Sequence, residues 1–412
     1  MNAGEPKVSF YAWAVVALLW PVALLNYLDR QMIATVRASI RADIPSIAND
    51  QEFGMLMALF MWVYALCSPV GGFIADKFNR RWTVIGSLLV WSLMTWLTGH
   101  AHSYNEMKVY RALMGLSEAF YIPAALALIA DFHTGATRAR AVGIHQTGIY
   151  SGLALGGIGG YIADCSSWRN CFVWFGAAGL AYAVLLMFTL RDVKQETTAA
   201  EKRHVTVLQT LRALGSRPAF WILVIYFTLP AVSGWVTKNW LPTFLADAFH
   251  LKQGPAGMSA TGYIQLASLA GVFLGGVVAD EWMRRTNRGR IFTSALGVLL
   301  LVPALLMLGG AWSLPAAIAA MILFGIGWGF YDCNNMPILC QIARPEHRAT
   351  GYGFMNLVSI SMGGAATVVL GWMRDHQIGF CTALVAAAAL ALASAALLLP
   401  IKPRAADFQG LP

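Results

Sequence analysis

Apolar stretches of about twenty residues recur along the whole chain, separated by short polar breaks. A helix of about twenty apolar residues spans the roughly 30 Å of hydrocarbon in a bilayer. Within lipid every backbone N–H and C=O must be satisfied internally, so these stretches are predicted to be helices. Charged residues make up only 12% of the chain, against about 25% in ordinary globular proteins. The sequence therefore predicts an all-α membrane protein.

Twelve transmembrane helices are predicted, in two sets of six. The first set covers residues 11–36, 52–76, 82–100, 106–131, 139–163 and 169–190; the second covers 219–246, 257–281, 290–311, 314–342, 350–373 and 378–400. The first segment lacks a charged leader with a small-residue cleavage site, so we expect it to remain as helix 1. The longest polar interruption predicts three parts: an N-terminal six-helix bundle at 1–190, a cytoplasmic linker at 191–217 and a C-terminal six-helix bundle at 218–412.

Basic residues gather in alternate predicted loops, which accounts for the net charge of +9. By the positive-inside rule these loops are cytoplasmic, which places both termini inside and predicts a multi-pass protein of the cell inner membrane. The positive charge is therefore explained by topology, and it predicts no nucleic-acid partner. The expected partners are the lipid bilayer and a small molecule.

The two halves share three landmarks in the same order. Residues 72–76, a Gly-to-Asp segment before two arginines, return as 276–280; Phe-Tyr at 120–121 returns at 330–331, and Arg-Ala-x-Gly at 140–143 returns at 348–351. Two parallel repeats that enclose a midplane site are a recurring transporter architecture. The functional site is therefore expected between the halves.

These motifs carry a family resemblance. Gly72, Asp76, Arg80 and Arg81 match the loop signature of the major facilitator superfamily, and Arg111-x-x-x-Gly-x-x-Glu118 resembles its helix 4 motif. The resemblance covers essentially the whole chain. It implies the fold of that superfamily, twelve transmembrane helices in two pseudo-symmetric six-helix bundles, and secondary transport as the activity.

Two groups within the superfamily fit the sequence. Residues 26–30 (Asn-Tyr-Leu-Asp-Arg), Gln146, and 353–356 with the glycines that follow look like the anion:cation symporters, which carry galactonate, hexuronates, sialic acid or glutamate. Residues 26–30 and 115–123 also look like the spinster family of lysolipid and sphingoid carriers. Helix 5 lacks the Gly-Pro step of many drug antiporters, which disfavours multidrug efflux.

Five charged residues fall inside the predicted helices: Asp29, Arg30, Arg111, Glu118 and Asp332. Each charge costs about 2.5–3.5 kcal/mol near a bilayer centre on insertion scales, so the five must face a wet cavity or one another. Arg111 and Glu118 lie on one helical stripe but two turns apart, too far to be each other's closest partners.

Glu118 is the favoured proton site, and the resemblance assigns Asp29 and Glu118 as the proton-coupling pair. The alternative is a static ion-pair network that holds helices 1 and 4 together, with Arg30 neutralising Asp29. Asp332 lies one turn beyond the repeat counterpart of Glu118. It is either another protonatable site or a group that hydrogen-bonds within helix 10.

Arg30 is the best candidate to bind an anionic substrate, because a planar guanidinium matches a carboxylate in a bidentate fork. Arg111 can do the same or pair with a buried carboxylate, and Lys238 is either a second anion contact or a lysine that snorkels to the interface. Polar groups that can read substrate hydroxyls, or simply join helices, are Tyr27, His145, Gln146, Tyr150, Asn334, Asn335 and Asn356. The resemblance favours Gln146 and Asn356.

The loop residues Asp76, Arg80 and Arg81, with Asp280, Arg284 and Arg285, are predicted to gate the cytoplasmic side, although positive-inside anchoring alone would explain the arginines. Glycines at 148, 152, 156 and 160 form a small-xxx-small stripe along helix 5 that permits a close helix approach. Cys165 and Cys171 flank an outward loop where a disulfide is one alternative.

No nucleophile motif, metal-ligand spacing or cofactor motif occurs in the chain. The sequence therefore predicts a transporter, without a cofactor or metal, rather than an enzyme. The hypothesis that fits best is a monomeric, proton-coupled symporter of a small organic anion, such as a sugar acid or a sialate-like monocarboxylate. The alternative is a spinster-like carrier of lysophospholipid or sphingoid amphiphiles.

Overall fold

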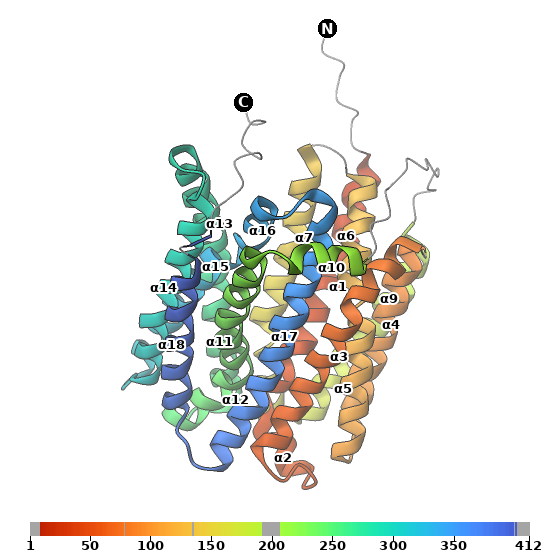
Figure 1. Cartoon of the computed structure of the whole chain (residues 1–412). Helices are drawn as coiled ribbons and strands as arrows, with labels where there is room; N and C mark the ends of the chain where they lie inside the picture. The colour runs from red at the N-terminus through yellow and green to blue at the C-terminus, as the bar shows by residue number, and fades with distance from the viewer. Residues whose placement is uncertain (1–8, 78, 134–135, 192–206, 399, 402–412) are drawn as a thin grey trace.

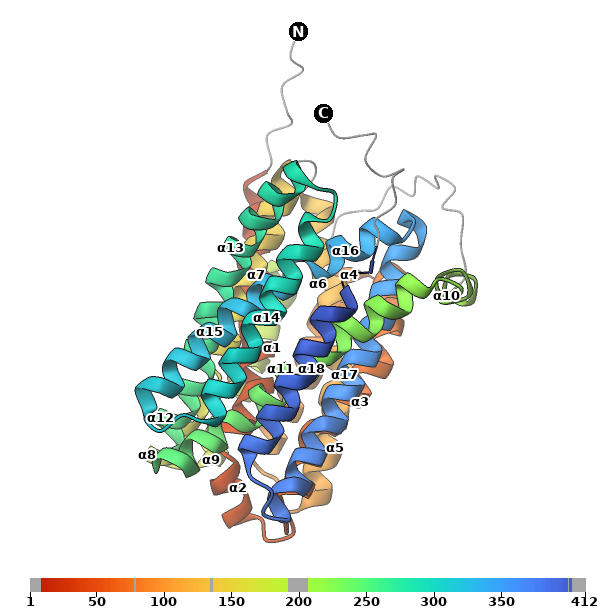
Figure 2. The same cartoon turned by 60° about the vertical axis from the view of Figure 1, so that its left-hand side comes forward.

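The computed structural model describes residues 9–77, 79–133, 136–191, 207–398 and 400–401. Over these residues the secondary structure is helical, without a strand, and the long helices run roughly side by side (Figures 1 and 2). The helix α1 begins and α18 ends at the same end of the molecule, which we call the termini end. The opposite end carries the short helix α2 (Arg37–Asp43) and is called the α2 end.

The first half of the described chain contains six long helical segments. Their bounds are α1 (Phe10–Thr35), α3 (Asp50–Lys77), α4 (Arg80–Thr98), α5 (Tyr104–Glu118) continued by α6 (Tyr121–Phe132), α7 (Ala136–Leu155) continued by α8 (Ile158–Cys165), and α9 (Trp168–Thr189). A short helix, α10 (Val207–Gly215), follows this half and lies across the long helices near the termini end.

The second half of the described chain also contains six long segments. They are α11 (Pro218–Phe249), α12 (Gln253–Met258) joined through a π-helical turn at Ser259–Tyr263 to α13 (Ile264–Arg285), α14 (Gly289–Gly309), α15 (Leu314–Asp332) continued by α16 (Asn335–Ile342), α17 (Pro345–Asp375) and α18 (Phe380–Leu398). Every predicted span falls on one of these twelve segments. The predicted all-α membrane fold is confirmed.

Ten of the segments in the described residues are long and apolar enough to cross a membrane by length and composition alone. The two others, α4 and the pair α7–α8, carry polar sequence near the termini end, including Arg80 and Arg81 in α4 and Arg138 and Arg140 in α7. Their membrane character follows from packing among apolar neighbours rather than from their own mean hydropathy.

Short breaks divide one long segment of each half beside a charged residue. Glu118 is the last residue of α5, and Asp332 is the last residue of α15. Each helix resumes after two residues, at Tyr121 and Asn335 respectively. The predicted repeat thus places a carboxyl group at an interruption in both halves.

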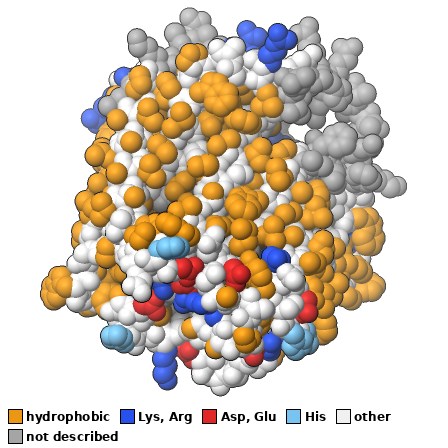
Figure 3. All heavy atoms as spheres, turned by 60° about the horizontal axis from the view of Figure 1, so that its bottom comes forward, with side chains coloured by type: hydrophobic (Ala, Val, Ile, Leu, Met, Phe, Trp, Pro, Cys, Tyr) orange, Lys and Arg blue, Asp and Glu red, His pale blue; other side chains and the backbone are white. Residues whose placement is uncertain are grey.

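The two halves meet at the α2 end through polar contacts. Arg374 of α17 donates to an Asp50 side-chain oxygen on α3 at 2.9 Å, and Asp375 accepts from the Asp50 backbone N–H at 2.9 Å. Asp164 of α8 accepts from the backbone N–H of Gly254 at 2.7 Å. Figure 3 shows acidic and basic side chains gathered in the middle of this face. These polar contacts therefore hold the two halves together at the α2 end.

Some glycines have free space beside them at both ends of the molecule. A Cβ placed on Gly143 of α7 or Gly353 of α17, in the parts of these helices nearer to the termini end, would meet no atom within 4 Å. The same holds for Gly262 and Gly379, nearer to the α2 end.

The glycine stripe of helix 5 allows the predicted close approach. A Cβ on Gly152 would overlap the Leu24 carbonyl oxygen of α1, and a Cβ on Gly148 would lie 2.8 Å from the Trp20 carbonyl oxygen. A Cβ on Gly157 or Gly160 would overlap the backbone of the 253–258 segment in the other half. The stripe thus packs against α1 within its own half and against α12 of the other half.

Candidate functional site

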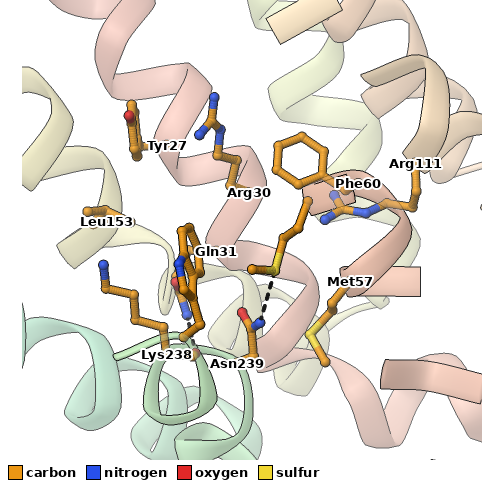
Figure 4. Close-up of a pocket in the computed structure, with 11 residues that line it drawn as sticks. Tyr27, Arg30, Gln31, Met57, Phe60, Arg111, Leu153, Lys238 and Asn239 are labelled. Atoms are coloured by element: carbon orange, nitrogen blue, oxygen red, sulfur yellow. Dashed lines mark hydrogen bonds between the residues drawn. The ribbon is translucent and has the colours of Figure 1, made fainter. Parts of the chain in front are cut away.

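A pocket lies between the two halves, among α1, α3, α5, α7 and α11 (Figure 4). Three of its lining residues come from the second half, and the rest from the first half. The lining residues are Tyr27, Arg30, Gln31, Met57, Phe60, Met61, Arg111, Leu153, Trp235, Lys238 and Asn239. It lies between the two halves, where the repeat predicts the site.

Arg30 of α1 forms a salt bridge with Glu118 of α5, from Nε to Oε2. The Glu118 side chain is completely buried, and its other oxygen, Oε1, has no hydrogen-bond partner among the described residues. The Arg30 guanidinium lies 4.5 Å from the ring centroids of both Tyr27 and Tyr64. This ion pair therefore joins α1 and α5 at the wall of the pocket.

Asp29 does not pair with its neighbour Arg30. Its side chain accepts a hydrogen bond from Thr95 of α4 at 3.1 Å, and its second oxygen has no partner among the described residues. Adjacent helical positions differ in direction by about 100°, which is why the two side chains reach different helices. Asp29 is buried and lies outside the pocket lining.

Arg111 also lacks the carboxylate partner that would be its simplest neighbour. Its Nε donates to the Leu56 carbonyl oxygen at 3.4 Å, and its guanidinium lies 4.7 Å from the Phe60 ring centroid. Arg30 lies 5.2 Å from the same ring. Phe60 therefore sits between two guanidinium groups, which its electron-rich ring faces can attract.

Lys238 of α11 lines this pocket from the second half. Its ammonium is 4.9 Å from the Trp328 ring centroid and 5.2 Å from that of Trp235, and its side chain is half-buried. The Lys238 backbone carbonyl accepts from Gln31 of α1 at 2.8 Å. The Lys238 side chain therefore lies at the contact between the halves.

Asp332 and Tyr150 join the halves on the α7 side. The Tyr150 hydroxyl donates to Asp332 Oδ2 at 3.3 Å. The alternative that Asp332 hydrogen-bonds within helix 10 is therefore not what the structure contains. Asp332 instead contacts a side chain of the opposite half.

Several residues proposed to read substrate hydroxyls lie outside the lining of this pocket. Gln146 is exposed on α7, and Asn356 is half-buried on α17. Asn335 is fully buried, with both side-chain amide atoms unpartnered among the described residues. His145 is buried and lies 2.9 Å from the Tyr121 hydroxyl through its Nε2, as expected for a packed histidine. The structure does not bring these residues into one cluster with Arg30.

The predicted gate residues make contacts within their own halves. Arg80 pairs with Asp131 of α6, and Arg290 pairs with Asp280 at 3.1 Å. Arg81 donates to the Met187 carbonyl oxygen, whereas Arg284 and Arg285 both contact Glu281, at 3.1 and 3.0 Å. The Asp76 side chain lies outside the described part of the chain. Gating by these groups stays a prediction.

Cys165 and Cys171 are both free in the structure. Cys165 is exposed, whereas Cys171 is buried with its sulfur 3.1 Å from the Gly159 carbonyl oxygen. The disulfide alternative is therefore not realised.

Residues 8–368 match the family model described as Major Facilitator Superfamily. The chain is 27% identical to a probable sulfoacetate transporter of Cupriavidus necator, over 88% of this chain and 86% of that protein. It is 24% identical to the hexuronate transporter of Bacillus subtilis, over 94% of each chain. It is 26% identical to the protein spinster of Drosophila melanogaster over 87% of this chain, but spans only 61% of that longer protein.

Among solved structures, a bacterial homolog of the human lysosomal transporter spinster matches in an inward-facing and unoccupied conformation. The TM-score is 0.74 at 21% identity, with 96% of each chain covered. At this identity the match establishes a shared fold.

Proposed function

The chain belongs to the major facilitator superfamily and is a membrane transporter rather than an enzyme, and from this premise we propose that it is a proton-coupled symporter of a small organic anion. The carrier works by alternating access, with the two six-helix units at 1–190 and 218–412 rocking about the pocket between them. Residues 191–217 link the units on the cytoplasmic side.

The observation that carries this proposal is the buried ion pair of Arg30 and Glu118 at the wall of that pocket. While Glu118 is ionised it occupies the guanidinium of Arg30. A proton on Glu118 removes the negative charge and frees Arg30 for the carboxylate of a substrate, which it can bind through two parallel hydrogen bonds. Proton and substrate then favour each other's binding, which is the thermodynamic requirement for symport.

Asp29 is proposed as a second proton site. It is buried on the same helix as Arg30, and its only hydrogen bond among the described residues comes from the neutral hydroxyl of Thr95. Arg111 provides a further positive charge near the pocket and helps to attract the anion. Tyr27 supports the Arg30 guanidinium, and we assign recognition of substrate hydroxyls to Gln146, Tyr150, Asn335 and Asn356.

If both termini are cytoplasmic, as the basic loops predict, the α2 end is the outer side of the carrier. The contact of Arg374 with Asp50 then closes the outer side. The gate residues Asp76, Arg80, Arg81, Asp280 and Arg284 are proposed to close the inner side in the opposite state. We place the carrier in the cell inner membrane as a monomer.

A lysolipid or sphingoid carrier is the second candidate, favoured by the similarity to spinster and by the aromatic pocket walls Tyr27, Phe60 and Trp235. An amphiphile needs an apolar compartment for its chain. The pocket also presents three cationic side chains, Arg30 and Arg111 from the first half and Lys238 from the second, which favours a small anion.

Uptake by the purified full chain in proteoliposomes tests the proposal. Labelled glucuronate, sulfoacetate and a lysophospholipid are offered under an inward proton gradient to wild type and to Glu118→Gln. We expect an acid to be concentrated by wild type. In Glu118→Gln, gradient-driven uptake should fall by at least about tenfold while exchange of the same acid persists, because the neutral amide mimics the protonated state.

Glu106 lies at the α2 end away from the pocket, where it accepts from the backbone N–H of His102 at 2.8 Å, and it supplies the matched control. Glu106→Gln should leave gradient-driven uptake intact. Gradient-driven accumulation by Glu118→Gln at the wild-type rate would refute the coupling role of Glu118. Transport of lysophospholipid alone would move the protein to the second candidate.

A further inference from the structure

Lys238 has no role in the coupling scheme above, although it lines the same pocket as Arg30. Its ammonium makes no hydrogen bond and no ion pair among the described residues, and contacts only the rings of Trp235 and Trp328. Asp332 acts on it electrostatically but lies beyond ion-pair distance and accepts from Tyr150 instead. Lys238 lies within a segment long and apolar enough to cross a membrane, and an ammonium there without an ion-pair partner is a functional feature by default, because such a charge is costly to bury.

The two cations come from opposite halves of the carrier. Arg30 belongs to α1, whereas Lys238 belongs to α11, and Gln31 next to Arg30 donates to the Lys238 backbone at 2.8 Å. Figure 4 shows both charged side chains around the same opening, with Gln31 between them. A ligand with an anionic group at each end would therefore touch both moving halves, whereas a ligand with one anionic group would engage only one cation.

The summed charge of the ionisable side chains around the pocket also favours a ligand with two anionic groups. Three cations, Arg30, Arg111 and Lys238, face three carboxyl groups, so the fully ionised set is neutral. If Asp29 and Glu118 take up protons as proposed above, three positive charges and the single negative charge of Asp332 leave a net charge of +2 (3 − 1). A bound dianion restores neutrality, while a monoanion leaves one uncompensated positive charge in a low-dielectric site.

We propose that Lys238 is a second anion-binding residue and that the transported substrate is a small dianion, with one acidic group at Arg30 and the other at Lys238. The short middle of such a molecule lies against the apolar and aromatic walls formed by Tyr27, Phe60 and Trp235. This inference rests on the proposed function and deepens it, because it names the charge class of the substrate. Dicarboxylates and sulfocarboxylates satisfy it equally.

Matched pairs of probes that differ by one acidic group test the inference. Glucarate is compared with glucuronate, and succinate with its half-amide succinamate, as competitors and as labelled substrates in proteoliposomes of the full chain. For wild type, at least one dianion should be taken up about tenfold better than its monoanionic partner. Lys238→Gln should reduce that ratio by about tenfold, because it removes one of the two charge contacts.

Two further variants separate charge from folding and from general surface effects. Lys238→Arg keeps the positive charge and should keep the preference for the dianion. Lys252 is exposed at the α2 end, so Lys252→Gln should leave the ratio unchanged. Monodisperse elution and an unchanged thermal midpoint of Lys238→Gln would establish that the loss of preference is not a loss of fold.

The failure of this inference and that of the proposed function give different results. Gradient-driven uptake of monoanions and dianions at equal rates, or an unchanged ratio in Lys238→Gln, would overturn the role of Lys238 while leaving proton-coupled anion transport intact. If neither charge class is transported under a proton gradient, the proposed function fails and the present inference fails with it.

Discussion

The two halves of the protein present their charges to the pocket in different ways. In the first half, Arg30 is bound to the buried Glu118 and held between two tyrosine rings. In the second half, Lys238 has no ion-pair partner among the described residues, and Asp332 reaches across to Tyr150. The first half thus presents Arg30 in an ion pair, beside Arg111, which contacts a carbonyl oxygen and the Phe60 ring. The second half presents Lys238 without an ion pair among the described residues.

This difference suggests a division of labour. A paired cation suits coupling, because its availability depends on the protonation of its partner. An unpaired cation suits recognition, because its charge attracts the ligand in every protonation state. The pocket would then combine a switch from one half with a fixed specificity contact from the other. This division would be wrong if the cation of the second half took part in coupling, or if the cation of the first half alone determined recognition.

The largest expected effect comes from removing the switched cation. Arg30→Ala should reduce both gradient-driven uptake and exchange by at least about 100-fold, because it removes the carboxylate contact and leaves Glu118 buried without its partner. Labelled-substrate counterflow and gradient-driven uptake in proteoliposomes measure the two rates. Loss of gradient-driven uptake with normal exchange would instead make Arg30 a coupling group that does not touch substrate.

Conservative substitution of each of the two cations tests the same comparison. Arg30→Lys should still reduce uptake by about tenfold, because a lysine cannot reproduce the planar fork or its stacking on Tyr27 and Tyr64. Lys238→Arg, in contrast, keeps the point charge that the second half provides. If Arg30→Lys and Lys238→Arg both keep uptake at a similar level, the proposed distinction between the halves would be wrong.

A smaller effect, on stability, is expected at the helix contacts that support each half. A Cβ on Gly152 would overlap backbone atoms of Leu24, whereas a Cβ on Gly353 would meet nothing within 4 Å. Gly152→Ala should therefore destabilise the protein by about 1–3 kcal/mol through overpacking. Gly353→Ala should be neutral or stabilising by up to about 1 kcal/mol, since alanine is the better helix former.

Thermal unfolding of both variants in detergent measures this difference. A lower midpoint for Gly152→Ala alone would support a rigid joint between α1 and α7 and free space beside α17. A similar loss in both variants would mean that Gly353 is packed in the state that predominates in detergent.

Hydropathy predicted the long segments because each buries about twenty residues in lipid. It missed contacts made beyond the apolar stretch. The predicted span 350–373 is extended in α17 to Pro345–Asp375, where Asp375 accepts from the backbone N–H groups of Asp50 and Gln51. Such an extension depends on a partner helix that lies far away in the sequence.

The sequence predicted which charged residues form the candidate site, but not which of them pair with each other. Helical spacing excluded a direct contact between Arg111 and Glu118, and the structure places Arg30 beside Glu118 instead. The sequence could not decide whether Arg30 turns toward Asp29 or toward helix 4, because that choice depends on how α1 is rotated against its neighbours.

The position of Lys238 along its helix depends on where α11 ends. The predicted span ended at residue 246, whereas α11 continues to Phe249. Lys238 therefore lies about 16 Å along the axis from the end of the helix, at 1.5 Å per residue.

The smallest expected effect tests whether the second half takes part in coupling. Asp332→Asn should leave gradient-driven accumulation within about threefold of wild type. The amide oxygen can still accept from the Tyr150 hydroxyl, and such hydrogen bonds between membrane helices contribute only about 0.6 kcal/mol on average. Accumulation ratios measured at several proton gradients, beside Glu118→Gln as the coupling-deficient reference, give the answer. If Asp332→Asn abolishes accumulation but not exchange, Asp332 also carries a transported proton. The fully protonated region would then hold a net charge of +3, and the division between a switching first half and a constant second half would be wrong.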